Sequence, residues 1–220
     1  MTLSLKIDGE SGELLQENLG FEAGVLTRPV VFDVDFENLN GLPGTWNSDI
    51  SGSGEEWDVV SSRWDSPIQS AFAPGRDSSG EASLLSPVFE LASSGGSLSF
   101  SHLYRLEPGF DGAVLEVSRD GGEWVDLLID PSVITIGGYN RSIREGFGSA
   151  IMGQQAWSGI LEVFTPVSVK LPVEWAGEML QFRWRVVHDA SSALGGWWID
   201  NVKMEMLAED CEPHRPEVTL

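Results

Sequence analysis

Short segments in which hydrophobic and polar residues alternate recur along the chain, and this period of two limits its fold more than any other feature. Successive side chains of a β-strand point to opposite faces, so strict alternation is typical of half-buried strands. In the segment 177–189, alternate positions place Leu180, Phe182, Trp184 and Val186 on one face. The same alternation marks the segments 29–36, 97–104 and 112–118. No stretch of about ten residues carries a helical apolar stripe, so we expect little or no helix.

Turn residues separate these segments and predict how they connect. Asp120-Gly121 supplies the two positive-φ residues of a tight hairpin turn, which predicts antiparallel pairing of 113–119 with 123–129. About ten strands at this spacing favour two antiparallel sheets packed face to face. The glycine-rich stretch 130–158 is long and weakly patterned, which is typical of a loop that binds a ligand or covers a sheet. The sequence therefore predicts an all-β chain built as a two-sheet sandwich.

The sandwich pattern covers residues 29–207, and this range is the predicted domain. Residues 1–28 are acidic and weakly patterned, and we interpret them as an N-terminal extension or the remnant of a preceding domain. Residues 208–220 are charged and contain proline, which is typical of a tail or linker. The first residues do not have the basic and apolar regions of a signal peptide. The chain is thus either cytoplasmic or a segment of a longer exported protein.

Charge excludes one class of partner. The chain has 34 acidic and 13 basic side chains, a net charge of −21. A nucleic acid or an anionic membrane surface would be repelled, so we expect no nucleic-acid partner. No apolar run approaches the roughly 20 residues that span a bilayer, so we expect no membrane insertion. The single Cys211 cannot form an intramolecular disulfide.

Four segments in a fixed order resemble a known group of modules. Together they resemble the MAM-like jelly-roll modules of bacterial exported proteins. The most similar variants are the choice-of-anchor J (cleaved-adhesin-like) domain and the module attached to immune-inhibitor-A-type metallopeptidases. The four segments are VDFENLNGLPGTW (34–46), SLLSPVFEL (83–91) with SLSFSHLYRLE (97–107), DGAVLEVSRDGGEWVDL (111–127), and GEMLQFRWRVVHD with GGWWIDNV (177–202).

The resemblance implies a two-sheet antiparallel jelly-roll β-sandwich of the concanavalin/MAM-like kind. It implies a non-catalytic accessory or adhesion module of an exported multidomain protein, with neighbouring domains of a longer chain as partners. It also implies an extracellular or cell-surface location. Many such modules carry a structural calcium ion near the first and last strands. The disulfides of eukaryotic MAM domains cannot form in this chain, which has one cysteine.

Asp200 is the best candidate for a metal ligand. Alternation places it on one face with Trp198 and Val202, which predicts that its carboxylate points into an apolar layer. An unpaired carboxylate there would cost several kcal/mol, so it needs a cation, an arginine or backbone amides. The resemblance places the first and last strands side by side, which would bring Glu37 close to Asp200. Oxygen ligands without His or Cys favour Ca²⁺.

Two points about this site stay open at the level of sequence. Alternation places Glu37 opposite the apolar face of the first strand, so a bulge or a position at the sheet edge is needed for it to meet Asp200. The alternative to calcium is a buried aspartate bonded to backbone amides. Further oxygen ligands could come from Asp35, Asp58 and Asp77.

Motifs for catalysis are absent from the sequence. It contains neither an H-E-x-x-H helix nor a G-x-S-x-G elbow. His102 and His188 each follow an alternating run on its apolar face. They could form a metal or acid/base site with Asp189, but we favour two core imidazoles bonded to backbone carbonyls. Acidic residues are too numerous to exclude a hydrolase by counting.

Nine tryptophans suggest a ligand class. Flat indole faces stack on sugar rings, although large rings also close the ends of a sandwich. The best candidate for an exposed cluster combines Trp64, Trp157, Tyr139 and Asn140. The leading hypothesis is therefore recognition of a glycan or a protein surface. The alternatives are a carbohydrate-active hydrolase that uses paired carboxylates and an architectural spacer without a ligand.

Overall fold

The computed structural model describes residues 28–207, and nearly all of its regular structure is β-strand. One 3-10 turn, η1 (Val173–Trp175), interrupts the strands. Within 28–207 the structure contains no helix with the length and apolar character needed to cross a bilayer. The predictions for residues 1–27 and for the tail 208–220, with Cys211, lie outside the described residues.

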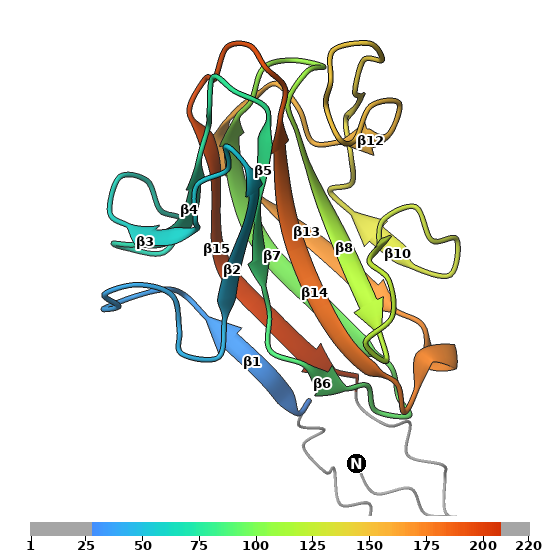
Figure 1. Cartoon of the computed structure of the whole chain (residues 1–220). Coiled ribbons are helices and arrows are strands. Elements are labelled where there is room, and N and C mark those ends of the chain that lie inside the picture. The colour runs from blue at the N-terminus through green and yellow to red at the C-terminus, as the bar shows by residue number, and fades with distance from the viewer. Residues whose placement is uncertain (1–27, 208–220) are drawn as a thin grey trace, which may run out of the picture.

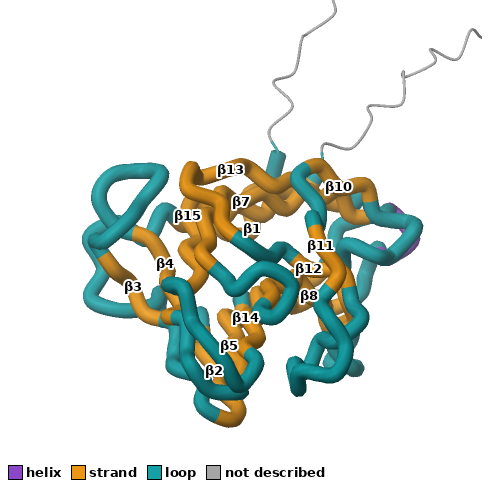
Figure 2. Tube along the Cα trace, turned by 90° about the horizontal axis from the view of Figure 1, so that it is seen from above, coloured by secondary structure: helices purple, strands orange, loops and turns teal. Residues whose placement is uncertain are grey.

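Two antiparallel sheets form the layers of a sandwich (Figures 1 and 2). In the first, the β7 sheet, neighbouring strands follow the order β10 (Ile134–Ile136), β13 (Ile160–Leu171), β7 (Gly96–Arg105), β15 (Gly196–Met206), β4 (Ser70–Pro74) and β3 (Asp58–Val60), and β1 (Val30–Val34) also pairs with β15. In the second, the β14 sheet, they follow the order β2 (Asn47–Gly52), β5 (Gly80–Leu85), β14 (Met179–His188), β8 (Gly112–Arg119) and β9 (Val125–Asp126), and β6 (Phe89–Glu90) also pairs with β14. The expected all-β, two-sheet fold is confirmed.

The core lies between the two sheets, where the apolar faces of the alternating segments meet. Phe100 of β7, Leu115 of β8 and Trp184 of β14 belong to one buried cluster. Phe182 and Val186 of β14 lie in the same cluster, as their alternation predicts. Burial of these side chains from both layers is the main source of stability in such a sandwich.

The predicted hairpin turn is confirmed, although the strand after it is shorter than the expected 123–129 and pairs with β8 only through Val125 and Asp126. Asp120 and Gly121 have φ values of 51° and 69°, the positive-φ pair that a tight turn requires. The Gly122 N–H donates to the Arg119 carbonyl at 2.9 Å and closes the turn. Beyond the turn, β8 pairs antiparallel with β9.

The long segment 130–158 covers part of the outer face of the β14 sheet. It contains β10 and a small ribbon of β11 (Arg141–Ser142) and β12 (Gln155–Ala156). Three of its buried residues pack against two outward-facing side chains of β8 and β14 and form a second, smaller core. The members are Ile143, Ile151, Ala156, Val114 and Val187. The segment therefore serves as a cover.

Gly196 begins β15 in a conformation that no other residue adopts easily. Its φ is +135°, and a Cβ atom there would collide with the Ala73 carbonyl oxygen and lie 2.8 Å from the Phe72 ring. We expect Gly196→Ala to lower the free energy of unfolding by about 2–4 kcal/mol in urea denaturation. Gly121→Ala is the control, because its φ is +69° but no atom lies within 4 Å. It should cost about 1 kcal/mol, and equal losses in the two variants would contradict the collision.

Candidate functional site

A β-bulge in β15 decides where Asp200 points. Asp200 pairs with Ser101 of β7 and Lys203 pairs with Ser99, so β15 advances three residues while β7 advances two. Asn201, inside this step, has a φ of +52°. With one extra residue in the strand, the side chains after the bulge alternate in the opposite sense from those before it.

The bulge overturns the predicted orientation of Asp200. Trp197 and Ile199 belong to the core before the bulge, and Val202 and Met204 belong to it after the bulge. Asp200 therefore lies on the outer side of the sheet and not in the apolar layer between the sheets. The prediction is wrong because the bulge interrupts the alternation between Asp200 and Lys203.

Asp200 is nonetheless fully buried, since the loop between β3 and β4 lies over it. Its Oδ2 accepts hydrogen bonds from the backbone N–H groups of Asp65 and Ser66, at 2.8 and 2.9 Å. Its Oδ1 accepts the Asn201 N–H at 2.7 Å and the Ser66 hydroxyl at 3.1 Å. Burial raises the pKa of the Asp200 carboxyl, and the N–H donors oppose this rise.

Glu37 accepts two hydrogen bonds from the same loop. It follows β1, and its Oε2 accepts the Ile68 N–H at 2.5 Å while its Oε1 accepts the Gln69 N–H at 2.9 Å. The Gln69 side chain in turn bonds the backbone N–H and carbonyl of Leu39, both at 3.0 Å. The two residues predicted as calcium ligands therefore meet on one short segment, residues 65–69.

The other predicted ligands are dispersed. Asp35 accepts the N–H of Glu37 at 3.0 Å, a local turn contact. Asp58 accepts the N–H of its neighbour Val59, and Asp77 accepts the N–H of Ala193. Each of these carboxylates is used by a different part of the backbone.

Calcium does not fit this arrangement of residues. Across residues 28–207, no three His, Cys, Asp or Glu side chains are grouped to hold a metal ion. Both oxygens of Asp200 face N–H and O–H donors, whose positive ends a cation would have to displace. The calcium ion stays a prediction of the sequence resemblance.

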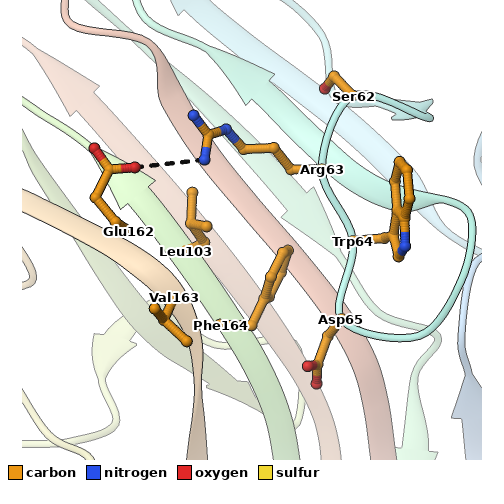
Figure 3. Close-up of a pocket in the computed structure, with 8 residues that line it drawn as sticks. All are labelled: Ser62, Arg63, Trp64, Asp65, Leu103, Glu162, Val163 and Phe164. Atoms are coloured by element: carbon orange, nitrogen blue, oxygen red, sulfur yellow. Dashed lines mark hydrogen bonds and ion pairs between the residues drawn. The ribbon is translucent and has the colours of Figure 1, made fainter.

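A groove of about 410 Å³ lies beside this loop, on the outer side of the β7 sheet (Figure 3). One wall is the β3–β4 loop, the other is β13, and Leu103 of β7 lies between them. We call it the Trp64 groove. It is lined by Ser62, Arg63, Trp64, Asp65, Leu103, Glu162, Val163 and Phe164.

The β13 wall is built by a second bulge. Leu161 pairs with Tyr104 and Thr165 pairs with His102, so the three residues 162–164 lie opposite Leu103 alone. Bulges of this kind turn side chains away from the regular ladder. The bulge places Glu162, which is charged, and two apolar side chains along the groove.

Charged groups cross the mouth of the groove. The Arg63 Nη1 atom lies 3.4 Å from Glu162 Oε2, and Arg105 Nε lies 3.6 Å from Glu162 Oε1. The Arg63 guanidinium also lies over the Trp198 ring, 5.4 Å from its centroid. Trp64 is 42% exposed, and its ring lies across the loop from Phe164 in Figure 3. Trp64 therefore forms the rim of the groove, while Leu103 and Phe164 supply apolar lining.

The cluster that the sequence predicted around Trp64 does not form. Trp157 is only 2% exposed, and its Nε1–H is shared between the carbonyls of Gly137 and Gly138, at 3.0 Å from each. Its ring packs edge-on against Tyr139, with centroids 4.9 Å apart. The expected exposure of Trp157 is wrong, because strand β8 pairs with this residue and draws it into the sandwich.

Tyr139 and Asn140 support the covering segment. The Tyr139 hydroxyl donates to Asp126 at 2.8 Å. Asn140 exchanges two hydrogen bonds with the backbone of Ser158, at 2.9 and 3.1 Å. Of the four predicted ligand-binding residues, Trp64 lines the groove described above.

The two histidines of the domain are core residues on different sheets. His102 is 2% exposed, and burial lowers its pKa to about 3. Its Nδ1 accepts the Trp197 indole N–H at 3.4 Å, so its partner is an indole and not the expected backbone carbonyl. His188 is 1% exposed and lies 3.7 Å from Asp111, measured from Nδ1 to Oδ2.

Two other surfaces are less suited to a ligand. A hollow of about 720 Å³ opens between β2 and β3, but its tryptophans, Trp46 and Trp57, pack against Trp184 and Trp197 of the core. The outer face of the β14 sheet is occupied by ion pairs. They join Arg183 to Glu116 at 2.6 Å, Arg185 to Glu116 at 3.0 Å and Arg185 to Glu81 at 2.6 Å.

Comparison with known proteins identifies the fold. No family model and no curated protein matches the chain. Among solved structures, the K1 cleaved adhesin domain of Lys-gingipain from Porphyromonas gingivalis W83 has a TM-score of 0.50 at 17% identity, over 80% of this chain and 98% of that domain. The K3 cleaved adhesin domain of the same protein has a TM-score of 0.48 at 15% identity, over 82% and 100%. TmCBM61, solved in complex with β-1,4-galactotriose, has a TM-score of 0.46 at 13% identity, over 76% and 90%. The chain therefore has the β-sandwich fold of the K1 cleaved adhesin domain.

Proposed function

We propose that this chain is a non-catalytic binding module of an exported multidomain protein and recognises a glycan in the Trp64 groove. The observation that carries the proposal is the exposed indole of Trp64 beside a groove with both apolar and hydrogen-bonding side chains. Binding sites for small ligands commonly combine apolar lining with a few placed polar groups.

The chemistry of the groove suits a sugar. A pyranose ring has C–H faces that pack on an indole and hydroxyl groups that exchange hydrogen bonds at its edge. Trp64 offers the indole at the rim, and Arg63, Asp65 and Glu162 offer donors and acceptors along the groove. The shared fold with a cleaved adhesin domain is in keeping with a binding module.

Trp64→Ala tests the proposal. We expect this variant to weaken binding to a responsive polysaccharide by about tenfold or more, because an exposed aromatic anchor supplies much of the contact. The measurement is affinity electrophoresis against β-1,4-galactan, xylan and β-glucan, after a glycan array has shown which is bound. The melting temperature should change little, since Trp64 is 42% exposed.

Trp124→Ala is the matched control. Trp124 belongs to the β14 side, where the Arg183 guanidinium lies 4.5 Å from its ring centroid, and it does not line the groove. It should leave binding unchanged. Loss of binding in Trp124→Ala but not in Trp64→Ala would place the site on the other sheet, and hydrolysis of the polysaccharide would support an enzyme instead.

A further inference from the structure

The backbone of residues 65–69 is held in an unusual way. Pro67 has no N–H group, and each of the other four N–H groups in this range donates to a carboxylate. Asp200 accepts the first two, and Glu37 accepts the last two. Neither acceptor is part of the loop: one sits on the bulge of β15 and the other follows β1.

The loop has no comparable support from a strand partner. Residues 61–69 lie between β3 and β4, and they include Arg63, Trp64 and Asp65, which line the groove. Hydrogen bonds from N–H groups to a carboxylate are stronger than those to a neutral acceptor. Two carboxylates therefore fix the backbone directly after the groove residues.

We infer that Asp200 and Glu37 are positioning residues that hold the groove loop in its binding form without a metal ion. The donors that face Asp200 occupy the directions from which a cation would bind it. Backbone N–H groups of the loop therefore neutralise these two carboxylates, which is the part that a calcium ion would otherwise play. The link to binding rests on the proposed function, but the anchoring is independent of any ligand.

Amide hydrogen exchange measured by NMR on the full chain tests the anchoring. Asp200→Asn turns one oxygen into an N–H donor that faces other donors, so exchange at Asp65 and Ser66 should accelerate by about tenfold or more. Glu37→Gln should accelerate exchange at Ile68 and Gln69 in the same way. The control Asp77→Asn removes a carboxylate that accepts the Ala193 N–H, and it should leave all four amides unchanged.

The unmodified protein provides the metal test even if a variant fails to fold. Addition of EDTA or of Ca²⁺ should leave exchange at the four amides unchanged. If EDTA accelerates exchange at these amides, or Ca²⁺ slows it, a metal ion holds the loop and the inference is overturned. Unchanged exchange in folded Asp200→Asn and Glu37→Gln would overturn it as well.

Polysaccharide binding separates this inference from the proposed function. Asp200→Asn should weaken binding to the responsive polysaccharide by about tenfold, which is similar to the loss expected for Trp64→Ala. If exchange responds as expected but no glycan binds the unmodified protein, the proposed function fails and the anchoring stands. If Trp64→Ala weakens binding but Asp200→Asn does not, the positioning role is overturned.

Discussion

Trp157→Ala should lower the free energy of unfolding by about 3–5 kcal/mol. The indole is 2% exposed and packs against His102 and Tyr139, with ring centroids 4.7 and 4.9 Å away. Its removal leaves a cavity in the core and two carbonyls, those of Gly137 and Gly138, without their shared donor. Urea denaturation followed by far-UV circular dichroism measures the loss.

Trp64→Ala is the natural comparison for this prediction. Both residues lie in or beside loops, but Trp64 is 42% exposed. Its truncation should cost less than about 1 kcal/mol, in keeping with surface substitutions. A Trp157→Ala protein with nearly unchanged stability and lost glycan binding would show that Trp157 is a ligand residue after all.

Acid should destabilise the domain through His102. The folded imidazole stays neutral until about pH 3, whereas the unfolded one takes up a proton near the ordinary histidine pKa of 6.5. Between these values the unfolded state binds more protons, so stability falls as the pH falls. From pH 7.5 to pH 4.5 this one group should remove about 2.5 kcal/mol from the free energy of unfolding.

His102→Leu isolates this contribution. The variant loses the acceptor for the Trp197 indole N–H and should be less stable at pH 7.5. Between pH 7.5 and pH 4.5, its free energy of unfolding should nevertheless fall by about 2.5 kcal/mol less than that of the unmodified protein. Carboxyl groups titrate equally in both proteins and cancel in the difference. Parallel pH profiles for the two proteins would refute a neutral, buried imidazole.

Alternation in the sequence was sufficient to predict the core of the sandwich. Leu180, Phe182, Trp184 and Val186 are all buried in the cluster between the sheets. The pattern works there because β14 lies between β5 and β8 with regular pairing along both edges. The Asp120-Gly121 turn was predictable for a similar reason, since its φ values are a local property of two residues.

The groove could not be predicted in the same way. Both of its walls depend on irregular pairing, the bulge at residues 162–164 in β13 and the bulge after Asp200 in β15. A bulge is defined by the partner strand, so the alternation of one strand does not reveal it. The sequence signal that was available was Asn201, a residue type that tolerates positive φ.

The exposure of individual tryptophans could not be predicted from the sequence either. Trp157 forms an antiparallel β-bridge with Ala113 of β8. This contact exists only when the covering segment folds back on β8. Trp64 is 42% exposed on a loop whose backbone N–H groups donate to Glu37 and Asp200. Both outcomes depend on contacts between residues distant in sequence.

The pairing of β1 with β15 also determines how the domain would respond to mechanical load. The chain enters and leaves at one end, where the Met206 N–H donates to the Pro29 carbonyl at 2.8 Å. Tension applied through residues 28 and 207 would act across the antiparallel ladder of β1 and β15 and would break its hydrogen bonds one after another. Once β1 separates from β15, the tension acts on Glu37 and on its hydrogen bond from the Ile68 N–H. Tension on the polypeptide would therefore release this anchor of the Trp64 loop before the two sheets separate.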